Sequence, residues 1–250
     1  MTVWLYTFGS VLIVSLLSFV GIIVLTIDQN KLKKILLFLV SFAVGGLFGD
    51  ALIHLIPESF EKLGFGLNTS LLIVLGILLF FVLEKFLHWQ HCHIPTSQEH
   101  VHPVVTINLV GDGVHNFLDG IIIGGSFLVS IPIGITTTLA VILHEIPQEI
   151  GDFGILIHKG LSVKKALLFN FFSALTAFAG AFLALTIGPH IQGFNTILLP
   201  ITAGGFLYIA GSDLIPELHH GTDMTPQNSI LQFLFIVLGV TVMALLTFLE

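Results

Sequence analysis

Two short polar motifs interrupt the apolar middle of the chain: HNFLDG at residues 115–120 and HEIPQEIGD at residues 144–152. On a helix, His115 and Asp119 are four residues apart and share one face. Imidazole and carboxylate groups together bind divalent transition metals such as Zn²⁺, Fe²⁺ and Mn²⁺, whereas an oxygen-only set would indicate Ca²⁺ or Mg²⁺. The two motifs therefore predict a site for a divalent transition metal between two helices.

Seven polar residues of these motifs are the candidate metal ligands. A single buried histidine is most often an ordinary hydrogen-bonded side chain, but ionisable groups gathered at one depth in two apolar segments indicate a site or a pathway. Several buried carboxylates also need a cation, or protons, to neutralise them. The candidates are His115, Asn116, Asp119, His144, Glu145, Gln148 and Glu149.

The segments that must position these residues are typical of a membrane protein. Of the 250 residues, 55% are hydrophobic and only 9% are charged, and apolar runs of about 20 residues recur along the chain. We predict an all-α polytopic protein with a single transmembrane domain over residues 1–250. Eight transmembrane helices are expected, at about 3–27, 35–58, 67–88, 104–130, 133–157, 164–187, 195–217 and 229–249.

The lysines predict the orientation of these helices, because cytoplasmic loops retain Lys and Arg. Seven of the eight lysines lie in or beside the connections after the first, third and fifth spans, and only Lys62 lies opposite. Both termini are therefore expected outside. The connection between the third and fourth spans, at about 89–103, is then cytoplasmic and holds four histidines and Cys92. It is either a weak metal buffer or a solvated polar loop.

An internal repeat predicts how the helices are arranged. At a constant offset of 159 residues, Gly45 aligns with Gly204, and the LIPE sequence at 55–58 aligns with LIPE at 214–217. With the lysine orientation, the second span runs outward and the seventh inward. The sequence thus predicts an inverted repeat of spans 1–3 and 6–8 around the central spans 4 and 5, which is typical of secondary transporters with a site at the middle of the membrane.

Further polar residues lie between the predicted site and the two membrane surfaces. Each LIPE sequence ends in a glutamate and follows a His or an Asp, and two more aspartates extend the polar faces of the central spans. Taken alone, the residues around LIPE are most simply interfacial groups at helix ends. Above and below a central site they become candidate pathway residues: His54, Glu58, Asp112, Asp152, Asp213 and Glu217.

The two central motifs resemble the paired signatures of the ZIP family of divalent-metal transporters. HNFLDG at 115–120 is followed by HEIPQEIGDF at 144–153, in the order found in that family. GDALIHLIPE, FFVLEKFLH and SDLIPE are similar to its second, third and seventh spans. The resemblance covers essentially all eight predicted spans, so it is far more specific than a short motif alone.

The resemblance implies uptake of Zn²⁺, or of Fe²⁺, Mn²⁺ or Cd²⁺, into the cytosol across the cell membrane by a homodimer. It implies a binuclear type of centre in which one ion is bound by His115, Asp119, His144 and Glu145. Asn116, Asp119 and Glu145 are then shared with, or contribute to, a second position. Relatives often carry His or Glu where this chain has Gln148, and some place a carboxylate on the sixth span, where this chain offers Asn170 and Ser173. No cofactor is expected, since the metal is the transported substrate.

Two other classes of protein have related sequence features. An intramembrane zinc metalloprotease uses HExxH, with two histidines one helical turn apart and a glutamate as base, but here Gln148 replaces the second histidine. A seven-helix receptor or lipid amidohydrolase would gather its zinc ligands near one membrane face rather than at the centre. We therefore expect a transporter and no enzyme, and the lack of a basic surface excludes nucleic acid as a partner.

Overall fold

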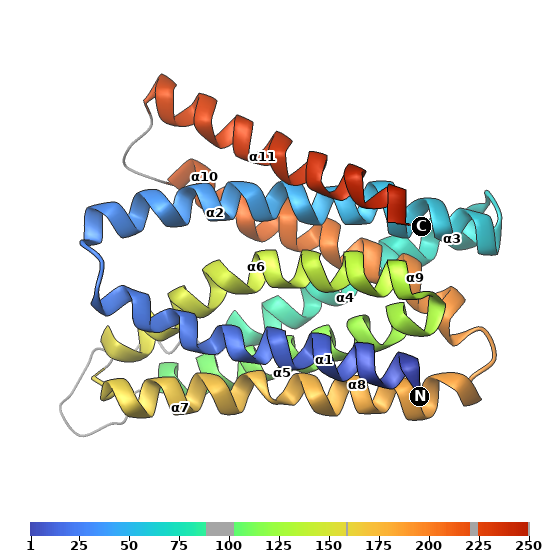
Figure 1. The fold of residues 1–250 in the computed structure, drawn as a ribbon, viewed down its shortest axis with the longest axis horizontal. Helices are drawn as coiled ribbons and strands as arrows, with labels where there is room; N and C mark the ends of the chain where they lie inside the picture. The colour runs from blue at the N-terminus through green and yellow to red at the C-terminus, as the bar shows by residue number, and fades with distance from the viewer. Residues whose placement is uncertain (89–102, 159, 221–224, 250) are drawn as a thin grey trace.

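The computed structural model describes residues 1–88, 103–158, 160–220 and 225–249, and within these ranges all regular structure is helical. Figure 1 shows the long helices lying side by side along one axis, with the two termini at the same end of the bundle. The elements are α1 (Thr2–Leu16), η1 (Leu17–Leu25), α2 (Gln29–Gly49), η2 (Asp50–Leu55), α3 (Ile56–Leu63), α4 (Leu67–His88), α5 (Pro103–Val129), α6 (Ile131–His158), α7 (Val163–Ala174), α8 (Thr176–Ile187), η3 (Gly188–His190), α9 (Phe194–Tyr208), η4 (Ile209–Leu214), α10 (Ile215–His220), α11 (Pro226–Leu246) and η5 (Thr247–Leu249).

Among the described residues, five helical stretches are long and apolar enough to cross a membrane: Thr2–Ile23, Lys34–Leu63, Leu67–Lys85, Val163–His190 and Pro226–Leu246. Thr196–Ser212 is a shorter apolar helix. The prediction of an all-α integral membrane protein is therefore confirmed. Each of the eight expected spans coincides with a helical run, but the count of eight crossings remains a prediction.

Two central helices, α5 and α6, carry the polar motifs. Hydroxyl groups of the neighbouring span fix α5 in place, because Ser173 Oγ donates to the Leu109 carbonyl at 3.2 Å and Thr176 Oγ1 donates to the Gly113 carbonyl at 2.5 Å. These two donors flank Leu175, where α7 ends and α8 begins. The expected sixth span is thus divided into two helices at the level where it holds α5.

Two π-helical segments interrupt the spans that carry LIPE. η2 begins at Asp50 and η4 begins at Ile209, 159 residues apart, which is the offset of the sequence repeat. In each case a proline, Pro57 or Pro216, follows two residues after the segment ends. A proline cannot donate the backbone hydrogen bond of a regular helix, and π-helical turns are rare and frequent at functional sites. The repeat therefore extends from sequence to backbone geometry.

Repeat-related glycines also make equivalent contacts. A Cβ atom added to Gly45 of α2 would lie 2.1 Å from the Ile236 carbonyl oxygen of α11. One added to Gly204 of α9 would lie 2.0 Å from the Ile73 carbonyl oxygen of α4. Both separations are shorter than any side chain tolerates, so glycine is required for these helix pairs to approach backbone to backbone.

Candidate metal centre

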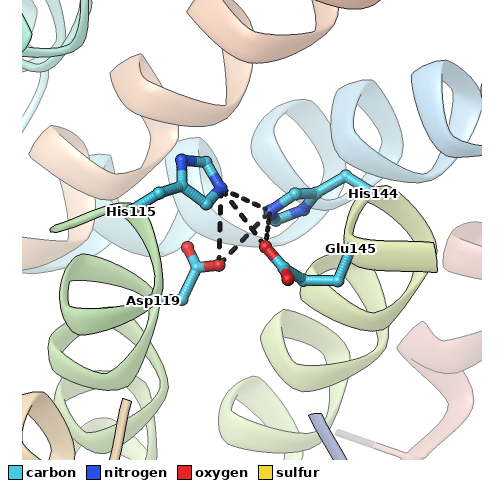
Figure 2. Close-up of side chains that lie close together, drawn as sticks. All are labelled: His115, Asp119, His144 and Glu145. Carbon is cyan, nitrogen blue, oxygen red and sulfur yellow. Dashed lines mark hydrogen bonds and ion pairs between the residues drawn. The ribbon is translucent and has the colours of Figure 1, made fainter. Parts of the chain in front are cut away.

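Four side chains from α5 and α6 converge on one point between the two helices (Figure 2). His115 and Asp119 come from α5, and His144 and Glu145 come from α6. One ligand atom from each lies within 4.8 Å of all the others. The i, i+4 spacing on α5 and the adjacent pair on α6 bring both imidazoles and both carboxylates together, as the sequence predicts.

Five of the six distances between the four ligand atoms are close to those around one tetrahedral ion. His115 Nε2 lies 3.2 Å from His144 Nε2, 3.3 Å from Glu145 Oε1 and 3.6 Å from Asp119 Oδ2. His144 Nε2 lies 3.4 Å from Asp119 Oδ2 and 3.6 Å from Glu145 Oε1. Nitrogen and oxygen ligands about 2.0–2.1 Å from a tetrahedral Zn²⁺ are roughly 3.3–3.4 Å apart. The cluster has the dimensions of such a site before any ion is placed in it.

Burial makes this cluster costly without a cation. The side chains of Asp119 and Glu145 are fully buried and that of His144 is 1% exposed, whereas His115 is 20% exposed. In the described part of the chain, no carboxylate oxygen of Asp119 or Glu145 accepts a hydrogen bond. Buried carboxylates without donors require a positive charge or protonation. His115 is the most exposed of the four ligands.

One hydrogen bond sets the tautomer of His144. Its Nδ1 lies 3.1 Å from the backbone carbonyl oxygen of Ala140, one turn back on α6. Because a carbonyl only accepts, Nδ1 carries the proton, and Nε2 keeps the lone pair that binds a metal. The Phe206 ring of α9 packs edge-on against the imidazole, with 6.2 Å between ring centroids. Sequence reasoning missed the Ala140 contact, although its spacing of four residues is the signal for it.

Asp112 connects the two predicted amide ligands beside the cluster. Asn116 Nδ2 donates to the Asp112 backbone carbonyl at 3.1 Å and to Asp112 Oδ1 at 2.9 Å. Gln148 Nε2 donates to the same carboxylate oxygen at 3.3 Å, from α6 across to α5. The side-chain oxygen of Asn116, Oδ1, is buried and accepts no hydrogen bond from any residue in the described ranges. Neither amide is one of the four converging ligands.

Glu149 faces the span on the other side of α6. Its Oε2 accepts a hydrogen bond of 2.9 Å from Asn170 Nδ2 of α7. Glu149 is fully buried, and its Oε1 accepts no hydrogen bond within the described part of the chain. The structure therefore separates this candidate ligand from the four-residue cluster and pairs it with Asn170, a partner that the sequence did not predict.

Three of the candidate pathway residues, His54, Glu58 and Asp152, form contacts outside the four-residue cluster. His54 is 2% exposed, and its Nε2 donates to the Met243 carbonyl oxygen of α11 at 2.9 Å. Glu58 forms an ion pair of 2.9 Å with Lys62, and Asp152 accepts a hydrogen bond of 3.0 Å from Asn108. The side chains of Asp213 and Glu217, and the histidine-containing connection at 89–102, fall outside the described residues.

A comparison with protein families identifies the family of the chain. The profile described as "ZIP Zinc transporter" matches residues 1–105 and 90–247. The chain belongs to the ZIP family. Family membership confirms the resemblance found in the sequence.

Curated relatives within the ZIP family are similar over most of the chain. Zinc transporter SLC39A7 of Rattus norvegicus is 29% identical over the whole chain and 73% of the relative. Zinc transporter ZIP4 of Mus musculus is 33% identical over 88% of the chain and 44% of the relative. Zinc transporter zipt-7.1 of Caenorhabditis briggsae is 29% identical over 99% of the chain and 80% of the relative. This ZIP chain thus spans most of two of these relatives and less than half of ZIP4.

Proposed function

We propose that this protein transports divalent transition-metal ions, above all Zn²⁺, into the cytosol through the site between α5 and α6. The observation that carries the proposal is the convergence of His115, Asp119, His144 and Glu145 at the separations of one tetrahedral ion. The curated relatives are named as zinc transporters. Fe²⁺, Mn²⁺ and Cd²⁺ suit the same donor set and are the competing substrates.

Transport is favoured over metalloprotease chemistry. An HExxH enzyme holds zinc with both histidines of one helix, but Gln148 stands at the second position and its amide donates to Asp112. The four converging ligands come from two helices, and an ion held by all four would leave no position for an activated water. A zinc amidohydrolase or receptor reading gains no support, since the relatives are transporters.

We also propose eight membrane crossings and an inverted repeat of spans 1–3 and 6–8. The two π-helical segments and the two glycine contacts recur at repeat-related positions. In Figure 1, α2 and α9 run in opposite directions, and the two termini lie at the same end, as an even number of crossings requires. An inverted repeat supports alternating access to a central site.

The orientation and assembly of the protein complete the proposal. Seven lysines against one support external termini, and the family resemblance supports a homodimer in the plasma membrane. We propose that Asn116 and Gln148 contribute weaker oxygen ligands to a second metal position, with Glu149 nearby. Asp112, Asp152, His54, Glu58, Asp213 and Glu217 are proposed to line the route to and from the site.

Uptake into proteoliposomes tests the transport function. Purified wild-type protein is expected to take up Zn²⁺ saturably, and His144→Ala is expected to abolish uptake because the ion loses one of four ligands. Glu61→Gln is the control, since Glu61 is exposed and lies in α3, which contributes no residue to the cluster. Uptake by His144→Ala at the wild-type rate would refute the site, whereas tight Zn²⁺ binding without uptake by wild type would refute transport.

A further inference from the structure

The carboxylate of Asp112 lies beside the proposed site. Its hydrogen-bond donors are two side-chain amides. Asp112 Oδ1 accepts hydrogen bonds from Asn116 on its own helix and from Gln148 on α6. The side-chain nitrogen of Asn116 donates to two acceptors of Asp112, the carboxylate and the backbone carbonyl. A carboxylate oxygen accepts, so the nitrogen of each amide must face Asp112.

This arrangement decides which atom each amide can offer to an ion. An amide nitrogen does not ligate a metal, whereas an amide oxygen does. With its side-chain nitrogen engaged, Asn116 has only Oδ1 left, and this oxygen is buried without a hydrogen bond in the described chain. Asn116 follows His115 directly, and Gln148 lies one helical turn after His144. Each amide therefore stands next to a ligand of the four-residue cluster.

We propose that Asp112 is a positioning residue that holds Asn116 and Gln148 with their carbonyl oxygens available to the transported ion. The proposal rests on the transport function proposed above and refines it. Two amide oxygens supply hard ligands to the second metal position proposed above, next to the four imidazole and carboxylate ligands. Hard oxygen ligands suit Mn²⁺, whereas softer Cd²⁺ relies more on imidazole. Asp112 thereby influences which divalent ions the site accepts.

Substitution of Asp112 gives the first test, by Zn²⁺ uptake into proteoliposomes with Mn²⁺ or Cd²⁺ as competitor. Asp112→Ala frees the Gln148 amide and leaves Asn116 only its bond to the backbone carbonyl of residue 112. It is expected to raise the KM for Zn²⁺ by about tenfold or more, as loss of a partner that orients metal ligands does. Competition by Mn²⁺ is expected to weaken more than competition by Cd²⁺. Asp112→Asn keeps an accepting oxygen, so its KM is expected to rise less than about threefold. Equal impairment by Asn and Ala would show that the charge matters rather than the positioning, and would overturn the proposal.

A double variant that lacks both amides distinguishes a positioning role of Asp112 from direct binding of the metal by Asp112. In Asn116→Ala/Gln148→Ala protein, Asp112→Ala is expected to change the KM and the competition profile no further, because Asp112 has no amide left to orient. A further loss in this background would identify Asp112 as a ligand itself and contradict the proposal. If Asp112→Ala does not fold, Asp112→Ser replaces it, since a serine hydroxyl is too short to reach both amides.

Binding measurements keep this inference independent of transport. Titration of Zn²⁺, Mn²⁺ and Cd²⁺ into purified, detergent-solubilised wild type and variants measures the affinity for each ion. The order of these affinities is then compared with the order found in the uptake competition. If wild type binds Zn²⁺ but does not transport it, the transport proposal fails while the Asp112 comparison still stands or falls on affinity. Identical affinities in wild type and Asp112→Ala would overturn the positioning role whatever the transport result.

Discussion

His115 Nε2 and His144 Nε2 lie 3.2 Å apart, although the two residues are separated by 29 positions and belong to different helices. Two imidazoles at this distance either share a proton or share an ion. Nδ1 of His144 donates its proton to the Ala140 carbonyl, so Nε2 of His144 keeps a lone pair. This Nε2 atom lies close to His115 and to both carboxylates. The contact between α5 and α6 at this point therefore depends on whether a proton or a metal ion lies between the two Nε2 atoms.

Metal binding should therefore stabilise the fold. At a Zn²⁺ concentration of about 100 times Kd, the free energy of unfolding of wild type is expected to rise by about 2.7 kcal/mol, whereas Asp119→Asn should gain little because it loses a charged ligand. Thermal unfolding in detergent, with EDTA or with Zn²⁺, measures this. Mg²⁺ is the ion control, since imidazole is a poor ligand for it. An equal Zn²⁺ effect in both proteins would place the stabilising ion elsewhere.

Acidification should weaken uptake. Protons compete with metal for Nε2 of His115 and His144 and for the two carboxylates, so metal affinity falls as pH falls. The KM for Zn²⁺ is expected to rise as the pH is lowered below neutral, because a proton bound to any ligand must leave before the metal binds. Proteoliposomes with the same pH inside and outside separate this effect from any proton gradient. A KM that stays constant or falls would argue against these ligands as the rate-controlling site.

The glycine contacts between helices should be intolerant of even one methyl group. Gly45→Ala and Gly204→Ala are each expected to lower the free energy of unfolding by about 1–3 kcal/mol, because the added Cβ meets a backbone carbonyl of the facing helix. Gly9→Ala in α1 is the control, as nothing lies within 4 Å of its added Cβ. Denaturant titration measures all three. If Gly45→Ala is as stable as Gly9→Ala, the contact of α2 with α11 is looser than described.

Replacing Gln148 by histidine tests the class of the protein. Gln148→His creates HExxH and exchanges an amide for an imidazole one turn after His144. We expect competition by Cd²⁺ to increase relative to Mn²⁺, since imidazole is the softer ligand, and no cleavage of a model protein substrate. Competition assays and a protease assay on the same preparation read both outcomes. Proteolysis by this variant would revive the metalloprotease reading.

The central cluster could be predicted from sequence because short spacings within single helices determine it. His115 and Asp119 share a face at i, i+4, and His144 and Glu145 are adjacent, so only the approach of two helices had to be assumed. The bond from Gln148 to Asp112 and the bond from Asn170 to Glu149 cross between helices. They depend on how far each helix is shifted along its neighbour, which no local pattern encodes.

Other features of the fold leave weak traces in the sequence. The LIPE repeat and its glycines predicted that the second and seventh spans are related, and they are interrupted at matching positions. The π-helical form of these interruptions was not predicted, because the prolines at 57 and 216 indicate only that a regular hydrogen bond is missing. The division of the sixth span at Leu175 was likewise not predicted, because no proline or glycine stands at this position.

A π-helical turn holds one more residue than the α-helical turn it replaces. Since each residue of an α-helix advances by about 100°, the face that Gly45 presents to α11 is out of phase with the residues beyond Leu55. A helical wheel drawn through the whole span would therefore misplace Glu58 by about one residue. The π-turn absorbs the extra residue, so a one-residue deletion within 50–55 would restore a regular α-helix and leave both the glycine contact and the LIPE end in their present orientation.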